Sequence, residues 1–358
     1  MLNPVALSII ANVFQDPKDR ARAIGVWGAV FGVALALGPL LGGALTQLYG
    51  WRYIFLINLP IGIAAIALTV LFVPESKAAK PRAIDIVGQS LVIIMLGCLT
   101  YAVIEGQHFG WHSPLTIGIF TVSALSLAAI LFYEPRRAEP LLDIRFFRSI
   151  PFFGATIIAI AAFGCFAGFL FLNALYLQQV RHFSAVQTGF CTLPLALMAM
   201  LCGPLSGRLV GSHGTRPSRV VAGVAMALST LALTRLSDGT PVLLLLFTYI
   251  TFGIGIGMVN PAISTVAVAG MPRSQAGVAA AIASTTRQVG ASLGVAVAGT
   301  IVASSRASGL DFAVATHSIW WVMVFCGSAI ALLGIATNTK WALRTSGKVA
   351  FLVQSANE

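Results

Sequence analysis

The chain has 358 residues, of which 58% are hydrophobic and only 9% are charged, and its mean hydropathy is +0.90. A soluble protein carries about 25% charged residues, so this composition excludes a water-soluble enzyme and predicts a membrane protein with several spans. The net charge of +11 would also suit a nucleic-acid-binding protein, but Lys and Arg lie in short clusters between apolar blocks, as in loops that face anionic lipid. Nucleic acid is therefore not an expected partner.

Apolar blocks follow one another along the whole chain. A helix needs roughly 20 mostly apolar residues to cross a bilayer. The first block, 1–14, is too short and is interpreted as the end of a helix. Ten later blocks are long enough, and their continuous apolar runs exclude a β-barrel, whose strands alternate. They predict an all-α membrane protein with spans at about 22–46, 53–73, 84–105, 113–133, 151–177, 187–210, 218–236, 241–268, 276–303 and 316–337.

The basic residues fix the expected orientation. One set of alternate connections, together with the tail, holds most of the 22 Lys and Arg residues. The other set holds only Arg52, Arg181, Arg235 and Arg306. Because Lys and Arg are enriched in cytoplasmic loops, this asymmetry predicts a multi-pass protein of the cell membrane. Its first residues would descend toward the cytoplasm, and its C-terminus would be cytoplasmic.

Two long polar connections, at about 74–83 and 134–150, bracket a pair of strongly aliphatic spans. This spacing predicts two bundles of helices with a two-helix insert between them. The expected divisions are the remnant of an N-terminal bundle, an insert with cytoplasmic linkers, a six-helix bundle and a cytoplasmic tail, at 1–74, 75–149, 150–338 and 339–358.

The first predicted span is unusually rich in small residues. Small residues let helix backbones approach closely in lipid, and a proline removes a backbone donor and bends its helix. Ordinary helix packing would explain a single pair of small residues four positions apart. It is a weaker explanation for a series of small residues that runs through the whole span. The series consists of Gly25, Ala34, Gly38, Pro39, Gly42 and Gly43.

This series resembles the antiporter motif on the fifth span of drug exporters in the major facilitator superfamily, which usually has Gly at the position of Ala34. Residues 50–62, 176–180 and 286–290 are similar to the fourteen-span, EmrB/QacA-like drug/proton antiporters. The resemblance covers essentially residues 1–338. It implies a major facilitator fold that lacks spans one to three and the start of span four. The acidic residues usually linked to proton coupling would lie in the missing part.

Residues 203–216 occupy the place of the family's second gating loop, which is expected to be cytoplasmic. The family commonly has Asp and Arg where this chain has Gly211 and Ser212, so the carboxylate of a charge-assisted latch is absent. A basic turn that anchors two helices at the lipid surface is an equally good interpretation. The candidate gating residues are Gly207, Arg208, Gly214 and Arg216.

Arg287 is the only charged residue that the sequence places deep inside a span. Because a lone cation at mid-membrane costs at least ~2.5 kcal/mol on insertion scales, it is expected to face the bundle interior or water. A place in the transport path is the favoured interpretation; a structural Arg bonded to backbone carbonyls is the alternative. Asn173 and Gln178, near the outer end of the 151–177 span, are further candidates for the path.

Other residue types give weaker signals. No Asp or Glu lies at the centre of a predicted span, so no proton carrier is assigned. The histidines do not cluster, so no metal site is predicted, and no cofactor is expected.

Several phenylalanines of the 151–177 span could line an apolar cavity, but a lipid-facing stripe explains them equally well. They are Phe163, Phe166, Phe169 and Phe171.

The resemblance implies proton-coupled efflux of lipophilic, drug-like compounds by alternating access. The expected partners are the lipid bilayer, a small lipophilic substrate and protons; the sequence does not decide whether a periplasmic adaptor takes part. A non-transporting truncated remnant, or a membrane scaffold, is the alternative. An intramembrane enzyme is disfavoured, because it would need catalytic residues clustered inside spans.

Overall fold

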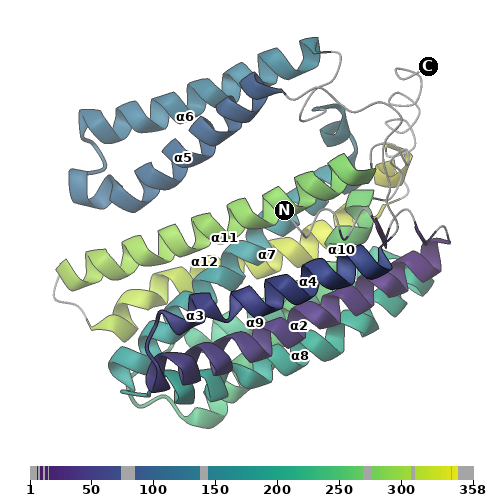
Figure 1. The fold of residues 1–358 in the computed structure, drawn as a ribbon. Coiled ribbons are helices and arrows are strands. Elements are labelled where there is room, and N and C mark those ends of the chain that lie inside the picture. Colours follow the sequence, from purple (N-terminus) through teal and green to yellow (C-terminus); the bar gives the residue numbers. More distant parts are fainter. Residues whose placement is uncertain are drawn as a thin grey trace.

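The computed structural model describes residues 6, 9, 10, 13, 14, 16–73, 85–137, 144–268, 276–307, 311–339 and 341–345. Within these residues the secondary structure is helical, without a strand, and the long helices lie alongside one another (Figure 1). The expected all-α fold is confirmed. The expected helix end in residues 1–14 and the tail beyond 345 fall mostly outside the described residues.

Each predicted span coincides with helix, and the second one is divided at Ile57. Within the described ranges, eight helical stretches are long and apolar enough to cross a membrane. The two predicted spans that do not meet this criterion are α9, which carries two arginines, and α11, which is rich in Gly, Ser and Thr. The elements are α2 (Pro17–Leu48), α3 (Tyr53–Leu56), α4 (Asn58–Phe72), α5 (Ile86–Phe109), α6 (Pro114–Tyr133), η1 (Glu134–Arg136), η2 (Ile144–Arg148), α7 (Ile150–Leu175), η3 (Tyr176–Val180), α8 (Ala185–His213), α9 (Thr215–Leu233), α10 (Val242–Val268), α11 (Ala276–Ala307) and α12 (Phe312–Ala336).

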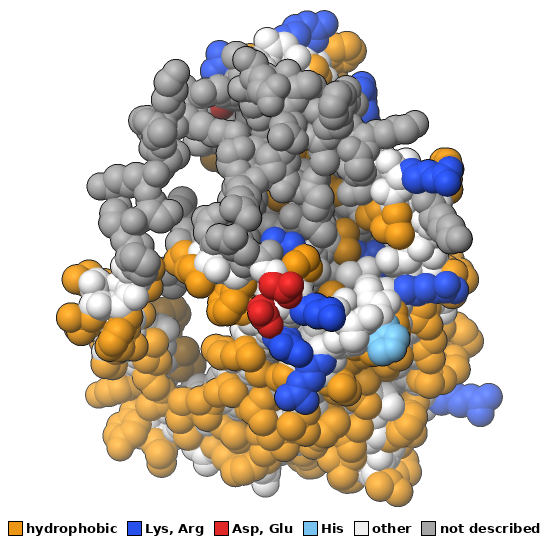
Figure 2. Space-filling view, turned by 90° about the vertical axis from the view of Figure 1, so that its right-hand side faces the viewer, with side chains coloured by type: hydrophobic (Ala, Val, Ile, Leu, Met, Phe, Trp, Pro, Cys, Tyr) orange, Lys and Arg blue, Asp and Glu red, His pale blue; other side chains and the backbone are white. Residues whose placement is uncertain are grey.

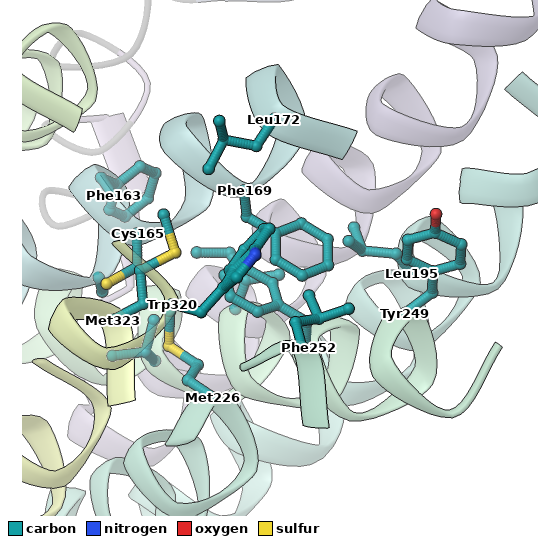
Figure 3. Close-up of a cluster of buried hydrophobic side chains, with 14 of the residues drawn as sticks. Phe163, Cys165, Phe169, Leu172, Leu195, Met226, Tyr249, Phe252, Trp320 and Met323 are labelled. Atoms are coloured by element: carbon teal, nitrogen blue, oxygen red, sulfur yellow. The ribbon is translucent and has the colours of Figure 1, made fainter. Parts of the chain in front are cut away.

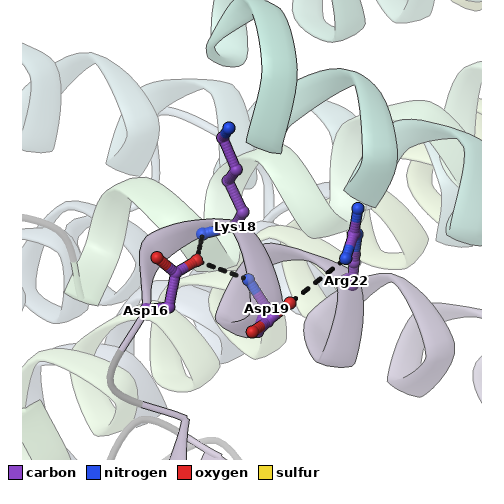
Figure 4. A network of polar contacts seen from close by, with 4 residues as sticks. All are labelled: Asp16, Lys18, Asp19 and Arg22. Atoms are coloured by element: carbon purple, nitrogen blue, oxygen red, sulfur yellow. Dashed lines mark hydrogen bonds and ion pairs between the residues drawn. The ribbon is translucent and has the colours of Figure 1, made fainter.

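Helix α2 begins earlier than the apolar pattern predicts, because polar residues cap it. The Asp16 carboxylate accepts hydrogen bonds from the backbone N–H groups of Lys18 and Asp19, at 2.7 and 3.1 Å (Figure 4). Pro17 stands in the first turn, where its missing donor costs nothing. Arg22 pairs with Asp19 at 3.2 Å, so the first turn of α2 is polar and the apolar part follows it.

Helices α7 to α12 share one hydrophobic core (Figure 3). The Phe169 ring of α7 stacks on Phe252 of α10 with centroids 4.1 Å apart, and it meets the Trp320 ring of α12 edge-on at 5.9 Å. Close by, Tyr249 donates a hydrogen bond to the Asn173 side chain at 2.8 Å. Aromatic packing and a satisfied buried polar pair thus hold these three helices together.

Hydrogen bonds between helix ends show that α9 and α12 run in opposite directions. At one end, Thr215 at the start of α9 bonds Asn338 just beyond α12 at 3.0 Å. At the opposite end, His317 near the start of α12 bonds the Leu236 carbonyl beyond α9 at 2.9 Å. Figure 2 views the molecule from the right-hand side of Figure 1, where Lys and Arg side chains and a small acidic group gather among hydrophobic ones.

Helix α2 packs on α8 through glycine backbones. A Cβ atom placed on Gly25 would lie 3.0 Å from the Cα of Gly207, and one on Gly43 would lie 2.8 Å from the Ala185 carbonyl oxygen. A Cβ atom on Gly32 would overlap the Met200 backbone. Side chains at these positions would push the two helices apart, so only glycine permits this contact.

The same helix carries glycines that do not pack. A Cβ atom placed on Gly38 or on Gly42 would meet no described atom within 4 Å. The small-residue series of α2 therefore has two faces: Gly25, Gly43 and the backbone of Pro39 lie close to α8, whereas Gly38 and Gly42 do not.

The paired helices α5 and α6 lie apart from the other helices in Figure 1 and reach them through α11. Ser123 on α6 donates to the Met95 carbonyl on α5 at 2.8 Å, which joins the pair. Thr300 on α11 donates to the Val103 carbonyl on α5 at 2.9 Å. Helix α4, by contrast, buries none of its residues.

The two faces of α2 give a direct test of the glycine contact. Gly32→Leu should lower the unfolding temperature of the detergent-purified protein markedly, because overpacking costs about 1–3 kcal/mol and α8 offers backbone there rather than a movable side chain. Gly42→Leu is the matched control on the same helix and should unfold near the wild-type temperature. Equal unfolding temperatures for the two variants would contradict the packing described.

Candidate functional site

A cavity of about 570 Å³ lies among α2, α7, α10 and α11. Its lining is mostly apolar and aromatic, with a few polar side chains contributed by α10 and α11. A volume of this size is ordinary for a small-molecule site. The lining residues are Trp27, Val30, Phe31, Ala34, Phe163, Phe166, Ala167, Leu170, Asn260, Ser284, Arg287, Gln288 and Ala291.

Arg287 supplies the positive charge of this cavity, and its side chain is only 6% exposed. Its Nη1 donates a hydrogen bond to the Ser264 hydroxyl at 3.1 Å. The guanidinium also lies 5.8 Å from the ring centroids of Trp27 and of Phe163, within the range of a cation–π contact. Its Nη2 is buried and donates to no described atom.

The expectation that Arg287 faces the bundle interior is met by this geometry. The hydrogen bond described for the guanidinium goes to a side-chain hydroxyl rather than to a backbone carbonyl. Two aromatic faces and one hydroxyl compensate the cation only in part. The transport role predicted for Arg287 stays a prediction, now with a cavity beside it.

Three phenylalanines form an aromatic corner next to Arg287. Phe31 of α2 lies 6.4 Å from Phe163 and 6.0 Å from Phe166, and these two rings of α7 are 6.2 Å apart. The sequence did not assign a ligand contact to Phe163 or Phe166. Their spacing of three residues, which puts them on one helix face, was a usable signal, but it did not show which face met the cavity.

The structure does not bring Asn173 or Gln178 to this cavity. Asn173 is buried in the core of α7 and α10, where it donates to the Phe169 carbonyl and accepts from Tyr249. Gln178 is exposed and lies in η3, beyond the end of α7. Asn173 already has partners, and a place in the transport path for either residue stays a prediction.

The candidate gating loop at 203–216 is helical for most of its length, which corrects the expected loop. Helix α8 continues to His213, and only Gly214, with φ +79°, forms the turn before α9. Gly207 is buried against Gly25 of α2 instead of lying in a loop. Arg208 and Arg216 are exposed near the turn, as either interpretation of this segment requires.

Arg219 is a second buried arginine, which lies near the start of its helix rather than deep inside a span. The sequence groups Arg219 with the loop arginines, but it belongs to α9 and is 0% exposed. Its Nη1 donates to the Thr337 hydroxyl at 2.9 Å, while Nε and Nη2 donate to no described atom. The missing side chain of Gly334 on α12 makes room for it.

Carboxylates are buried elsewhere. Asp85 caps α5 by accepting from the Gly88 N–H at 2.9 Å, and Glu134 is buried at the end of α6. Neither lines the cavity, and no Asp or Glu is found among its described lining residues. In the part of the chain that the structure describes, no group of three His, Cys, Asp or Glu side chains could hold a metal.

Comparison with known proteins gives a consistent family. The model of the Major Facilitator Superfamily matches residues 1–295. Multidrug resistance protein Stp of Mycobacterium tuberculosis is 34% identical over 306 residues, which are 86% of this chain and 57% of that protein. The tetracenomycin C resistance and export protein of Streptomyces glaucescens is 32% identical over 305 residues, 85% of this chain and 56% of that protein. The chain thus spans somewhat more than half the length of these relatives.

A solved structure shares the fold. The human organic anion transporter MFSD10 aligns with a TM-score of 0.59 over 91% of this chain and 67% of its own, at 19% sequence identity. At this identity the likeness shows the arrangement of helices alone. The names of the sequence relatives agree with the prediction of a transporter rather than an enzyme.

The buried Arg219 can be tested through its partner. Thr337→Val keeps the size of the side chain but removes the hydroxyl that accepts from Arg219, which leaves a buried cation without its described partner. Such losses cost about 1–3 kcal/mol or more, so the unfolding temperature should fall clearly. Thr121→Val, at an exposed position on α6 where the hydroxyl bonds a carbonyl of its own helix, is the control and should change it little. Equal unfolding temperatures would show that the Arg219–Thr337 bond does not stabilise the fold.

Proposed function

The chain belongs to the major facilitator superfamily, and we propose that its cavity among α2, α7, α10 and α11 binds lipophilic, drug-like compounds for export from the cell. The observation that carries this proposal is the cavity itself: about 570 Å³, largely apolar, with an aromatic corner beside the buried Arg287. Few fixed polar groups would let the site accept molecules of different shape. The relatives named for multidrug resistance and for tetracenomycin C export support this substrate class.

We infer alternating access as the mechanism. One wall of the cavity comes from α2, and the others come from α7, α10 and α11, so a movement of α2 relative to those helices would open or close the site. Coupling to protons entering the cell is part of the proposal and rests on the resemblance to fourteen-span antiporters. The described cavity lining offers no carboxylate for this step, so we assign no proton-carrying residue within it.

The orientation completes the proposal. The cell membrane is the expected location, with the start of α2, the turn between α8 and α9 and the end of α12 on the cytoplasmic side. The basic residues at or near these helix ends, or between α6 and α7, include Lys18, Arg20, Arg22, Arg136, Arg137, Arg145, Arg148, Arg208, Arg216 and Arg344. They outnumber Arg52, Arg181, Arg235 and Arg306 at the other helix ends, which supports the orientation through the preference of basic residues for the cytoplasmic face.

Substitution of Arg287 tests the site. Arg287→Ala should abolish or strongly reduce export, and Arg287→Lys should restore only part of it, because Lys keeps the charge but loses the planar fork of donors. The measurement is efflux of a panel of fluorescent lipophilic dyes of different charge from energised cells. It should be combined with substrate-induced proton flux in proteoliposomes.

Arg344→Ala serves as the control, since it removes an exposed arginine that neither lines the cavity nor belongs to the candidate gating residues. It should leave efflux near the wild-type rate. Normal efflux by Arg287→Ala at matched protein levels would reject the cavity as the transport site. No efflux of any dye by the wild type, despite correct membrane insertion, would favour the scaffold interpretation.

A further inference from the structure

We propose that the cavity selects aromatic molecules that carry a negative charge, and that an anionic oxygen of the ligand pairs with the guanidinium of Arg287. This inference rests on the proposed function and narrows its substrate class from lipophilic compounds in general to lipophilic aromatic acids. The ligand would place its ring in the aromatic corner and its charged oxygen at Arg287.

The first step of the argument is the charge balance. Arg287 is a nearly buried cation on the wall of a cavity. The described lining from α2, α7, α10 and α11 contributes aromatic, aliphatic, hydroxyl and amide side chains, and none of these carries a negative charge. A buried cation is costly without a paired anion. The described lining thus offers Arg287 no counter-charge, and an anionic ligand would supply one.

The second step concerns hydrogen bonds. Ser264 occupies Nη1 at 3.1 Å and fixes one side of the guanidinium, while Nη2 has no described acceptor. A carboxylate oxygen is a strong acceptor for such a donor. Asn260, which also lines the cavity, has a buried amide oxygen without a described donor. A hydroxyl or N–H group on the same ligand would satisfy it.

The third step concerns the apolar part. Phe31, Phe163 and Phe166 form the aromatic corner, and Phe163 also lies against the Arg287 guanidinium. A flat ring bound there would meet three aromatic side chains, while a short arm reached the cation. An aliphatic anion would use the charge but not the rings, and a neutral aromatic would use the rings but not the charge.

A carboxylate of the protein itself is the competing partner for Arg287. If such a group neutralised the guanidinium, the cavity would show no preference for an anionic ligand. The two cases therefore differ in a measurable way: the selectivity between an acid and its uncharged ester.

The experiment compares pyrene-1-carboxylate with its methyl ester, two fluorescent probes that share the same ring system. Binding to the purified protein in nanodiscs is measured at neutral pH by fluorescence anisotropy. We expect the wild type to bind the carboxylate at least about tenfold more tightly than the ester, the scale of a partly desolvated charge pair. Arg287→Gln should erase this ratio with little effect on the affinity for the ester.

Two more variants separate charge from packing. Arg287→Lys should keep part of the preference, because it keeps the cation. Phe166→Ala should weaken both probes by a similar factor, because it removes a ring contact that both use. A structural role for Arg287 would instead lower both affinities together.

Each outcome is decisive. Equal affinities of the wild type for acid and ester, or an acid preference that survives Arg287→Gln, would overturn the inference while leaving a general lipophilic site intact. A clear acid preference without any transport of the acid in proteoliposomes would reject the proposed function and keep the binding site. Failure of the wild type to bind either probe would overturn both.

Discussion

The contact between the glycines of α2 and the backbone of α8 determines where the cavity wall stands. Gly25, Gly32 and Gly43 meet α8 over several turns, so the whole length of α2 is brought to backbone distance from it. Trp27 and Phe31 belong to the same stretch of α2 and reach the cavity from there. Moving α2 outward by one side-chain layer would separate Phe31 from Phe163 and Phe166 and would take Trp27 away from Arg287. The position of the aromatic corner therefore depends on the glycine contact between α2 and α8.

The buried polar groups of this molecule are paired to different degrees. In the core of α7 and α10, Asn173 both donates and accepts, so its amide fixes the packing of two helices. Arg287 has one described hydrogen-bond partner, Ser264, and retains a buried donor without one. Arg219 also keeps buried donors without a described partner, so it is the cavity beside Arg287 that distinguishes that arginine as a candidate site. Native structures leave few buried polar groups unsatisfied, and those few tend to have a specific reason. The cavity beside Arg287 supplies such a reason, because a ligand bound there can accept a hydrogen bond from the unpaired donor.

The fold could be predicted from the sequence because hydropathy and basic-residue asymmetry are strong, additive signals over many residues. Arg287 was identified because a charge inside a long apolar run is expected to face the bundle interior or water. Arg219 was missed because it stands four residues into α9 beside other arginines, where a buried and an exposed cation look alike in one dimension. Likewise, the spacing of glycines on α2 shows which residues share a face, but only the position of α8 shows that Gly25 packs and Gly42 does not.

A contact between bare helix backbones also has a dynamic consequence. Two helices that interlock through large side chains must unpack them to slide, whereas glycine surfaces offer no such knobs. Glycines also bring α7 close to α11, α8 close to α10 and α9 close to α12, but aromatic rings additionally join α7 to α10 and α12, and hydrogen bonds join α9 to α12. Among the described residues, no aromatic pair or side-chain hydrogen bond joins α2 to α8. If the helices move during a transport cycle, we therefore expect α2 to move along α8. Such a motion would change the aromatic corner and the surroundings of Arg287 together, because Trp27 and Phe31 would travel with α2 while Phe163 and Arg287 stayed behind. A ligand bound between these two sets of residues would therefore have an affinity that depends on the position of α2. A transporter needs such a dependence if its ligand is to favour one conformation over the other.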